Sequence, residues 1–344
     1  MTELTIILPV YNEIKEYVIA SIDSILQQTF SDFYLYITLD KPTNIELQVL
    51  LEEYADKDSR ISFFTNEENM GLPKTLNRML TRVKTKFVAR MDADDIAKPD
   101  RLQRQYDFML NNPNVDLCGT NIIYIDKEGN EISKKASLPE RERLIRKSLS
   151  YLDVLVHPSF FAKSSVMEKM GYRDLKYAQD YDLVCRLAEA GYHLANINEY
   201  LLYYRIGLNA ERKLLEQWLT AKVIRIYYNK RKLCSIDIVP LVSVAISHIS
   251  NDDIKRYSHS NKIHKEGVLH WKNGNRIKGM IYILKSLFLS KMQKDDFIRW
   301  NILRHNGIRS NNYIVSYMYA SNNFGARINN YIVSQNRIII SILS

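Results

Sequence analysis

The sequence predicts an α/β fold: a mostly parallel sheet with helices on both faces, followed by an α-helical extension. Two observations carry this prediction. Hydrophobic periodicity alternates four times between strand and helix within the first hundred residues, and polar residues follow each of those four strands. The helical extension is predicted from apolar residues that recur every three and four positions after residue 207.

The first predicted strand, 4–10, begins almost at the first residue and is rich in β-branched residues, as a buried parallel strand is. The other expected strands are 34–39, 61–65 and 87–91, and the expected helices are 16–28, 45–54, 72–83 and 101–110. Strands separated by helices pair in parallel, because each connection must cross a face of the sheet.

Polar side chains gather where the four strands end. Tyr11-Asn12-Glu13 follow the first strand, Asp40 the second, residues 66–69 the third and residues 92–95 the fourth. Ligands of open parallel sheets bind beyond the carboxyl ends of the strands. We therefore expect a single binding crevice at this edge.

The acidic segment Asp92-Ala93-Asp94-Asp95 is the strongest chemical signal in the chain. Three neighbouring carboxylates repel one another unless a cation lies between them. Oxygen ligands suit Mn²⁺ or Mg²⁺, which commonly also bind substrate phosphates. The alternative is a solvated acidic turn before the next helix, and the other three strand ends favour the metal site.

Other kinds of site lack their signatures. The first strand is not followed by the glycine pattern of dinucleotide-binding sheets, and Gly71 to Thr75 only faintly resembles a phosphate-binding loop. Cys118, Cys185 and Cys234 are too widely spaced for a disulfide framework or a zinc site. We find neither a signal peptide nor an apolar run long enough to span a bilayer, and so expect a cytoplasmic protein, at most peripheral on the inner face of the cell membrane.

Charge divides the chain. Residues 1–206 hold 26 Lys and Arg against 31 Asp and Glu, a net of −5, whereas residues 207–344 hold 22 against 8, a net of +14. We expect domains at 1–207 and 208–344, the second basic and mainly helical. The expected helices there are 212–229, 238–248, 261–271, 277–289 and 295–304.

Two interpretations of the basic part stay open. It packs on the sheet with a solvated basic face, or it docks on an anionic membrane surface or a diphosphate-linked lipid. The stretch 313–344 is compatible with either. No nucleic-acid-binding module is recognisable, so no nucleic-acid partner is expected.

Five segments together resemble the family 2 glycosyltransferases of the GT-A fold, a Rossmann-like α/β fold. They are residues 7–13, Asp40, residues 69–71, residues 92–95 and Gln179-Asp180-Tyr181-Asp182. The resemblance covers roughly residues 3–207. It implies transfer of a sugar from a nucleotide-sugar donor, with inversion at the anomeric carbon and with Mn²⁺ or Mg²⁺ as cofactor.

The resemblance also implies residue roles. Asp94 and Asp92 would bind the metal, Asp180 would be the general base, and Asp182 would be structural. His157 and Gln179 would contact the acceptor. Donor contacts would come from Pro9, Tyr11, Glu13, Asp40, Asn69, Gly71, Asp92 and Ala93. Arg78 and Arg90 are further candidates for phosphate contacts.

The chain departs from the family pattern at three positions. Leu39 stands where relatives often have an aspartate, Gln179 where they often have a glutamate, and Gly207 where they often have a histidine. Without the resemblance, Asp180 would be interpreted as a helix cap.

We expect a non-processive hexosyltransferase that moves galactose, glucose or N-acetylglucosamine from a uridine diphosphate (UDP) donor. The implied acceptor is a lipid-linked glycan in O-antigen, capsule or lipooligosaccharide biosynthesis. The alternatives are a nucleotidyltransferase of related fold and a non-catalytic membrane- or nucleic-acid-binding protein.

Overall fold

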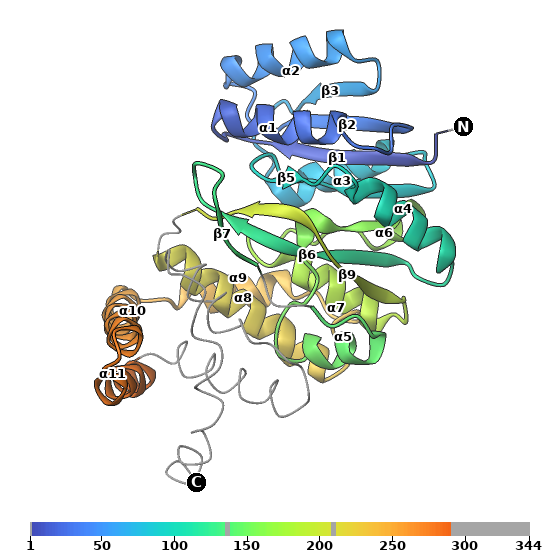
Figure 1. Ribbon diagram of the computed structural model, residues 1–344. Helices are drawn as coiled ribbons and strands as arrows, with labels where there is room; N and C mark the ends of the chain where they lie inside the picture. The colour runs from blue at the N-terminus through green and yellow to red at the C-terminus, as the bar shows by residue number, and fades with distance from the viewer. Residues whose placement is uncertain (1, 135–137, 208–210, 290–344) are drawn as a thin grey trace.

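The computed structural model describes residues 2–134, 138–207 and 211–289, whose strands form one nine-stranded sheet (Figure 1). The N-terminal half is parallel, in the order β3-β2-β1-β4. Its strands are β1 (Leu4–Val10), β2 (Phe33–Leu39), β3 (Ile61–Thr65) and β4 (Phe87–Arg90). This half confirms the predicted alternation of strand and helix.

The second half of the sheet is mixed. Strand β8 (Phe161–Lys163) lies antiparallel between β4 and β6 (Leu117–Ile125), and β9 (Leu194–Arg205) runs parallel to β6. Two short strands complete the sheet: β5 (Ile96–Ala97) pairs with β9, and β7 (Glu131–Lys134) with β6. Because β5 directly follows the acidic segment, that segment lies beside the end of β9.

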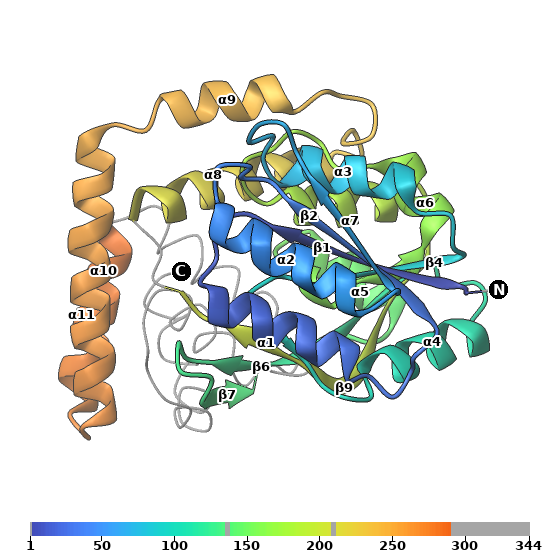
Figure 2. The same cartoon turned by 90° about the horizontal axis from the view of Figure 1, so that it is seen from above.

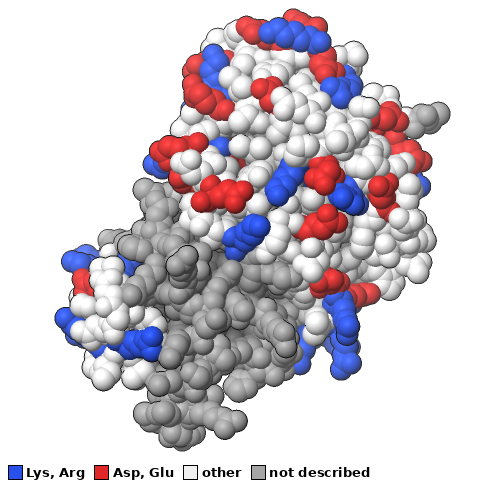
Figure 3. Space-filling model, in the orientation of Figure 1, with Lys and Arg blue, Asp and Glu red and all other residues white. Residues whose placement is uncertain are grey.

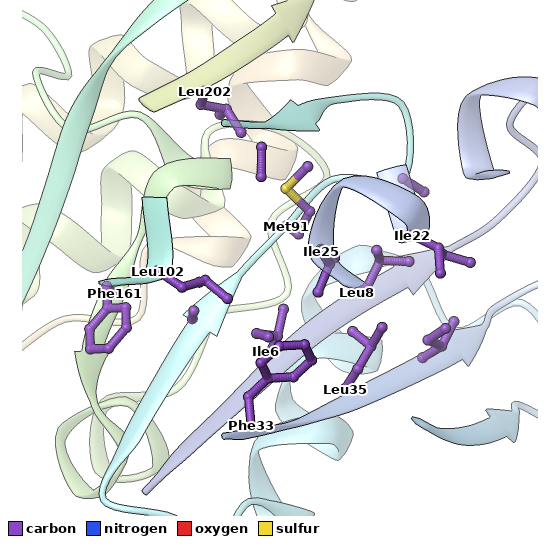
Figure 4. Close-up of a cluster of buried hydrophobic side chains, with 14 of the residues drawn as sticks. Ile6, Leu8, Ile22, Ile25, Phe33, Leu35, Met91, Leu102, Phe161 and Leu202 are labelled. Carbon is purple, nitrogen blue, oxygen red and sulfur yellow. The ribbon is translucent and has the colours of Figure 1, made fainter. Parts of the chain in front are cut away.

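Helices cover both faces of the sheet, as the β1 sequence requires. Leu4, Ile6 and Leu8 point to one hydrophobic cluster, and Ile7 points to the cluster on the opposite face. In Figure 4, Ile22 and Ile25 of α1 lie close to Leu8. Helices α1 (Lys15–Leu26), α2 (Ile45–Lys57) and α4 (Arg101–Asn111) cover the first face. Helices α3 (Leu72–Arg82), α5 (Glu142–Leu149), α6 (Ser164–Met170) and α7 (Gln179–Glu189) cover the second.

The C-terminal helices continue from this second face. Ile224 of α8 belongs to the same buried cluster as Leu183 of α7, and the carboxylate of Glu189 accepts the backbone N–H groups of Leu233 and Cys234. The helices are α8 (Glu211–Asn229), α9 (Val239–Ser247), α10 (Asn251–Lys272) and α11 (Arg276–Leu289). The predicted boundary at residue 207 stays a prediction.

Helices α10 and α11 form a hairpin beside the rest of the molecule, seen end-on in Figure 1 and lengthwise in Figure 2. Helix α10 is about twice as long as predicted, because Ser250 and Asp253 form a capping box that starts it at Asn251. The expected helix 295–304 and the stretch 313–344 lie outside the described residues. Within residues 2–134, 138–207 and 211–289, no helix is both long and apolar enough to cross a membrane.

Candidate active site

Three aspartates meet directly after β4. One carboxylate oxygen each from Asp92, Asp94 and Asp95 lies within 4.8 Å of the other two. The segment is tied to α1, because Ser21 Oγ donates to the Asp92 carbonyl at 2.8 Å. It is also tied to β9, because the backbone N–H of Arg205 donates to Asp95 Oδ1 at 2.8 Å.

Burial and neighbouring negative charge raise the pKa of Asp94, Asp95 and Glu13. Burial, together with the charges of Asp92 and Glu13, raises the pKa of Asp94 to about 7. Burial and the charges of Asp92 and Asp94 raise the pKa of Asp95 well above its ordinary value. The pKa of Glu13 is raised by burial, and the Tyr11 backbone N–H opposes that rise. A cation at this point would relieve the repulsion among these groups.

The residues fit a divalent cation. Asp95 Oδ2 is buried and has no hydrogen-bond partner among the described residues, and Asp92 and Asp94 are only partly buried. An all-oxygen donor set of carboxylates suits Mn²⁺ or Mg²⁺. The predicted pair of metal ligands, Asp92 and Asp94, therefore lies together, with Asp95 beside it.

Arg90 supplies positive charge beneath the cluster. Its side chain is only 3% exposed and forms an ion pair with Asp92. Within the described part of the chain, its Nε and Nη1 atoms have no hydrogen-bond partner. Its charge also acts on Asp180 and His157. Arg90 therefore acts as a buried counter-charge next to Asp92, and its expected phosphate contact stays a prediction.

Asp180 lies in the first turn of α7, after Ala178, whose φ of 53° places it in the left-handed region. Its Oδ1 accepts the Tyr181 backbone N–H at 2.9 Å. Burial raises the pKa of Asp180, whereas that hydrogen bond and Arg90 oppose the rise. Electrostatic interaction with both Arg90 and Asp92 links Asp180 to the end of β4. Asp182, by contrast, is fully buried and pairs with Arg186 at 2.7 Å and Arg173 at 3.3 Å, as a structural residue does.

Asp40 organises the loop after β3. Its carboxylate accepts hydrogen bonds from Asn66 Nδ2 at 2.7 Å and from the backbone N–H groups of Met70 at 2.9 Å and Gly71 at 2.8 Å. Gly71 has a φ of 80°, a value that L side chains rarely adopt. Arg78, expected to contact phosphate, donates to Asn66 Oδ1 at 3.2 Å. Asp40 thus positions residues 66–71 whatever it binds.

The remaining predicted donor residues lie at the ends of β1 and β4 or in the loop after β3. Pro9 and Ala93 are buried, Tyr11 is 44% exposed, and Asn69 Oδ1 accepts the Gly71 N–H at 3.1 Å. Glu13 shares the electrostatic environment of Asp92 and Asp94.

The two predicted acceptor residues are both buried. His157 Nε2 lies 2.9 Å from the Tyr172 hydroxyl, and burial lowers the pKa of the imidazole well below its ordinary value. The ring is therefore neutral at physiological pH. Gln179 is 8% exposed, next to Asp180 at the start of α7.

Two arginines have structural roles that the sequence analysis missed. Arg205 Nε donates to the Asp94 carbonyl at 2.8 Å, and its guanidinium lies 4.1 Å from the Tyr17 ring centroid. Arg101 is fully buried and donates through Nη2 to the Arg90 carbonyl at 2.7 Å. Their only sequence signal is a basic residue next to an apolar run, which is common on surfaces.

Comparison with known proteins identifies glycosyltransferases, the class that the sequence motifs resemble. Residues 5–171 match the sequence profile described as glycosyl transferase family 2. An uncharacterised glycosyltransferase of Methanocaldococcus jannaschii is 37% identical over 206 residues, which cover 59% of this chain and 70% of that protein. The O-antigen biosynthesis glycosyltransferase WbnJ of Escherichia coli is 35% identical over 213 residues, covering 61% of this chain and 82% of WbnJ.

Solved structures share the fold at low sequence identity. The Staphylococcus aureus TarS structure 1–349 in complex with UDP has a TM-score of 0.52 and 16% identity, covering 80% of this chain and 88% of that one. The mannosyltransferase PcManGT of Pyrobaculum calidifontis, in complex with GDP-mannose and Mn²⁺, has a TM-score of 0.53 and 14% identity, covering 93% of this chain and 85% of that one. The fold is therefore GT-A.

The nucleotidyltransferase and non-catalytic alternatives are set aside by these matches. The chain belongs to glycosyltransferase family 2 and is a glycosyltransferase of GT-A fold.

Proposed function

We propose that the protein transfers a hexose from a UDP-sugar to a lipid-linked glycan, with inversion and one sugar per encounter, in the assembly of a bacterial surface polysaccharide. The observation that carries this proposal is the grouping of Asp92, Asp94 and Asp95 with Asp180 around the buried guanidinium of Arg90. The sequence similarity to WbnJ, named for O-antigen biosynthesis, supports the biological setting.

In this proposal Asp92 and Asp94 hold Mn²⁺ or Mg²⁺, and Asp95 supports them from its bond to Arg205. The bound cation would neutralise the negative charge that grows on the departing diphosphate. The base and ribose of the donor are contacted by the residues at the strand ends: Pro9, Tyr11, Glu13, Asp40, Asn69, Gly71 and Ala93. Arg90 holds Asp92 in place through their ion pair.

Asp180 acts as the general base on the acceptor. Its Oδ1 is occupied by the Tyr181 N–H, so we assign Oδ2 to the proton of the acceptor hydroxyl. The acceptor oxygen forms a bond to the anomeric carbon as the bond to the UDP oxygen breaks, and UDP leaves with that electron pair. His157 and Gln179 line the acceptor side, the former as a neutral ring.

A donor panel tests this proposal. Purified protein is titrated with UDP-galactose, UDP-glucose, UDP-N-acetylglucosamine and, for contrast, GDP-mannose, each with Mn²⁺, Mg²⁺ or EDTA. We expect metal-dependent binding and slow hydrolysis of one UDP-sugar. Binding that is equal in EDTA, or binding of GDP-mannose alone, would contradict the proposed donor and metal.

Asp94→Ala extends the test to the metal. We expect it to weaken metal-dependent UDP-sugar binding at least about tenfold, because the cation would lose a ligand. Asp174→Asn is a matched control: Asp174 is exposed, pairs with Lys74 at 3.0 Å and is not a member of the acidic cluster. An unchanged affinity in Asp94→Ala would remove its ligand role.

A further inference from the structure

The α10–α11 hairpin is packed too closely for its inner face to rotate. A Cβ atom at Gly267 would lie 2.9 Å from the Gly279 carbonyl oxygen, and one at Gly279 would lie 2.7 Å from the Gly267 carbonyl oxygen. Ser260 Oγ donates to the Ser286 carbonyl at 2.8 Å, and His264 Nδ1 lies 3.0 Å from Ser286 Oγ. Because these contacts fix the rotation of α11 about its axis, they also determine which face α11 exposes.

The exposed face of α11 carries an apolar stripe. Ile277 is 74% exposed, Ile281 is 55% exposed and Phe288 is 80% exposed. Spacings of four and seven residues put these three on one side of the helix, with half-buried Leu284 between them. Single exposed apolar residues need no explanation, but an aligned set marks an interaction surface.

Positive charge borders this stripe. Lys278 and Lys285 are exposed and lie two turns apart, along one edge of the apolar residues. Residues 251–289 as a whole hold 8 Lys and Arg against 3 Asp and Glu, a net charge of +5. In Figure 3 the end of the hairpin, at the lower left, shows mainly blue and white atoms.

We propose that the α11 stripe docks the enzyme on an anionic lipid bilayer. Ile277, Ile281 and Phe288 enter the boundary between headgroups and acyl chains, and Lys278 and Lys285 contact anionic headgroups. An apolar stripe edged by lysines is the pattern of helices that lie in the membrane interface. A second copy of the chain is a poorer occupant, because it would bring two hairpins of charge +5 together.

The position of the hairpin suits an acceptor held in a membrane. Both views place α10 and α11 on the side of the molecule toward which β1 runs (Figures 1 and 2). Because β4 is parallel to β1, the acidic segment that follows β4 lies at the same edge of the sheet. The membrane-docking helix and the sugar-transfer site would then lie on the same side of the protein. This inference goes beyond the proposed transfer reaction and does not depend on it.

Vesicle binding by the full chain tests the inference. The protein is sedimented with phosphatidylcholine vesicles, with and without phosphatidylglycerol, at low and at high salt. We expect binding to the anionic vesicles at low salt and release at high salt. Ile281→Glu with Phe288→Glu should weaken binding at least about tenfold, because two apolar side chains no longer enter the lipid. Lys278→Gln and Lys285→Gln should each weaken it about fivefold.

Ile45→Glu is the matched control, since Ile45 is 62% exposed on α2 and far from this helix in sequence. Thermal unfolding and UDP binding are measured for every variant. No binding to anionic vesicles, or equal binding by the Ile281/Phe288 variant, would overturn the inference. So would a stable dimer that this variant converts to monomer, because a second copy would then cover the stripe. Vesicle binding without UDP binding would leave the docking inference standing and count against the donor assignment alone.

Discussion

The backbone N–H of Arg205 donates a 2.8 Å hydrogen bond to Oδ1 of Asp95, and so joins the last residue of β9 to the acidic segment that follows β4. The Arg205 side chain reinforces this link through the Asp94 carbonyl and the carbonyls of Asp126 and Lys127. The carboxylates are therefore positioned from two distant parts of the chain. The proposed metal site therefore depends on a residue outside the carboxylate cluster.

Arg205→Met tests that dependence. We expect the free energy of unfolding to fall by about 2–4 kcal/mol, since three partly buried backbone carbonyls lose their donors. Metal-dependent UDP binding should weaken as well, because the Asp94 backbone is released. Urea denaturation and titration calorimetry measure the two effects, with Arg104→Met on the exposed side of α4 as control. A change within about 0.5 kcal/mol would mean that the strand pairing alone positions the segment.

The raised pKa of Asp94, about 7, predicts how stability depends on pH without metal. The native state holds a proton on Asp94 that the unfolded chain has already lost, so stability falls as pH rises from about 4 to about 7. Mn²⁺ should reduce this fall and should bind more weakly below pH 7, where protons compete with it. Thermal unfolding across this range measures both effects. Asp94→Asn should flatten the metal-free profile, and an unchanged slope in that variant would contradict the assignment.

Arg90→Met should show how much the negative charge of the carboxylates destabilises the fold when its buried counter-charge is removed. Loss of the buried partner of Asp92 should lower the metal-free stability by about 3–5 kcal/mol. Mn²⁺ should recover part of this loss, because it restores positive charge to the cluster. Urea unfolding with and without Mn²⁺ provides the comparison. Full metal-free stability in the variant would show that Arg90 is not the counter-charge.

Asp40→Asn tests whether Asp40 contacts the uracil of the donor or only holds the loop 66–71 in place. The amide would face N–H groups that the carboxylate now accepts, which we expect to cost about 2–3 kcal/mol. Gly71 has φ 80° and ψ 155°, a conformation almost confined to glycine, so Gly71→Ala strains the same loop by about 1–3 kcal/mol and leaves the carboxylate unchanged. Calorimetry with UDP compares the two variants. If Asp40 contacts uracil, its variant loses much more affinity than Gly71→Ala; equal losses would mean that Asp40 acts through the loop.

The parallel half of the sheet could be predicted because its strands are apolar runs separated by helices of ordinary length. Strand β8 could not, since three residues with no period of their own pair only through tertiary contacts. The turn that begins α7 could not be predicted either, because Ala178 adopts a left-handed conformation for which alanine gives no sequence signal. Arg90 resembled a phosphate ligand in sequence, and only the fold shows that it is buried beneath Asp92. The electrostatic interaction between Arg90 and Asp180, which are 90 residues apart in the chain, has no local sequence signal.

Asp180 is the residue on which the proposed transfer reaction depends most directly, and Asp180→Asn is the measurement to make. The variant should bind the UDP-sugar and Mn²⁺ as the wild type does, while donor turnover falls about 10²–10⁴-fold, since the acceptor loses its base. Asp174→Asn, in the same segment, should match the wild type in both. Full turnover in Asp180→Asn would contradict the central claim that this carboxylate takes the acceptor proton.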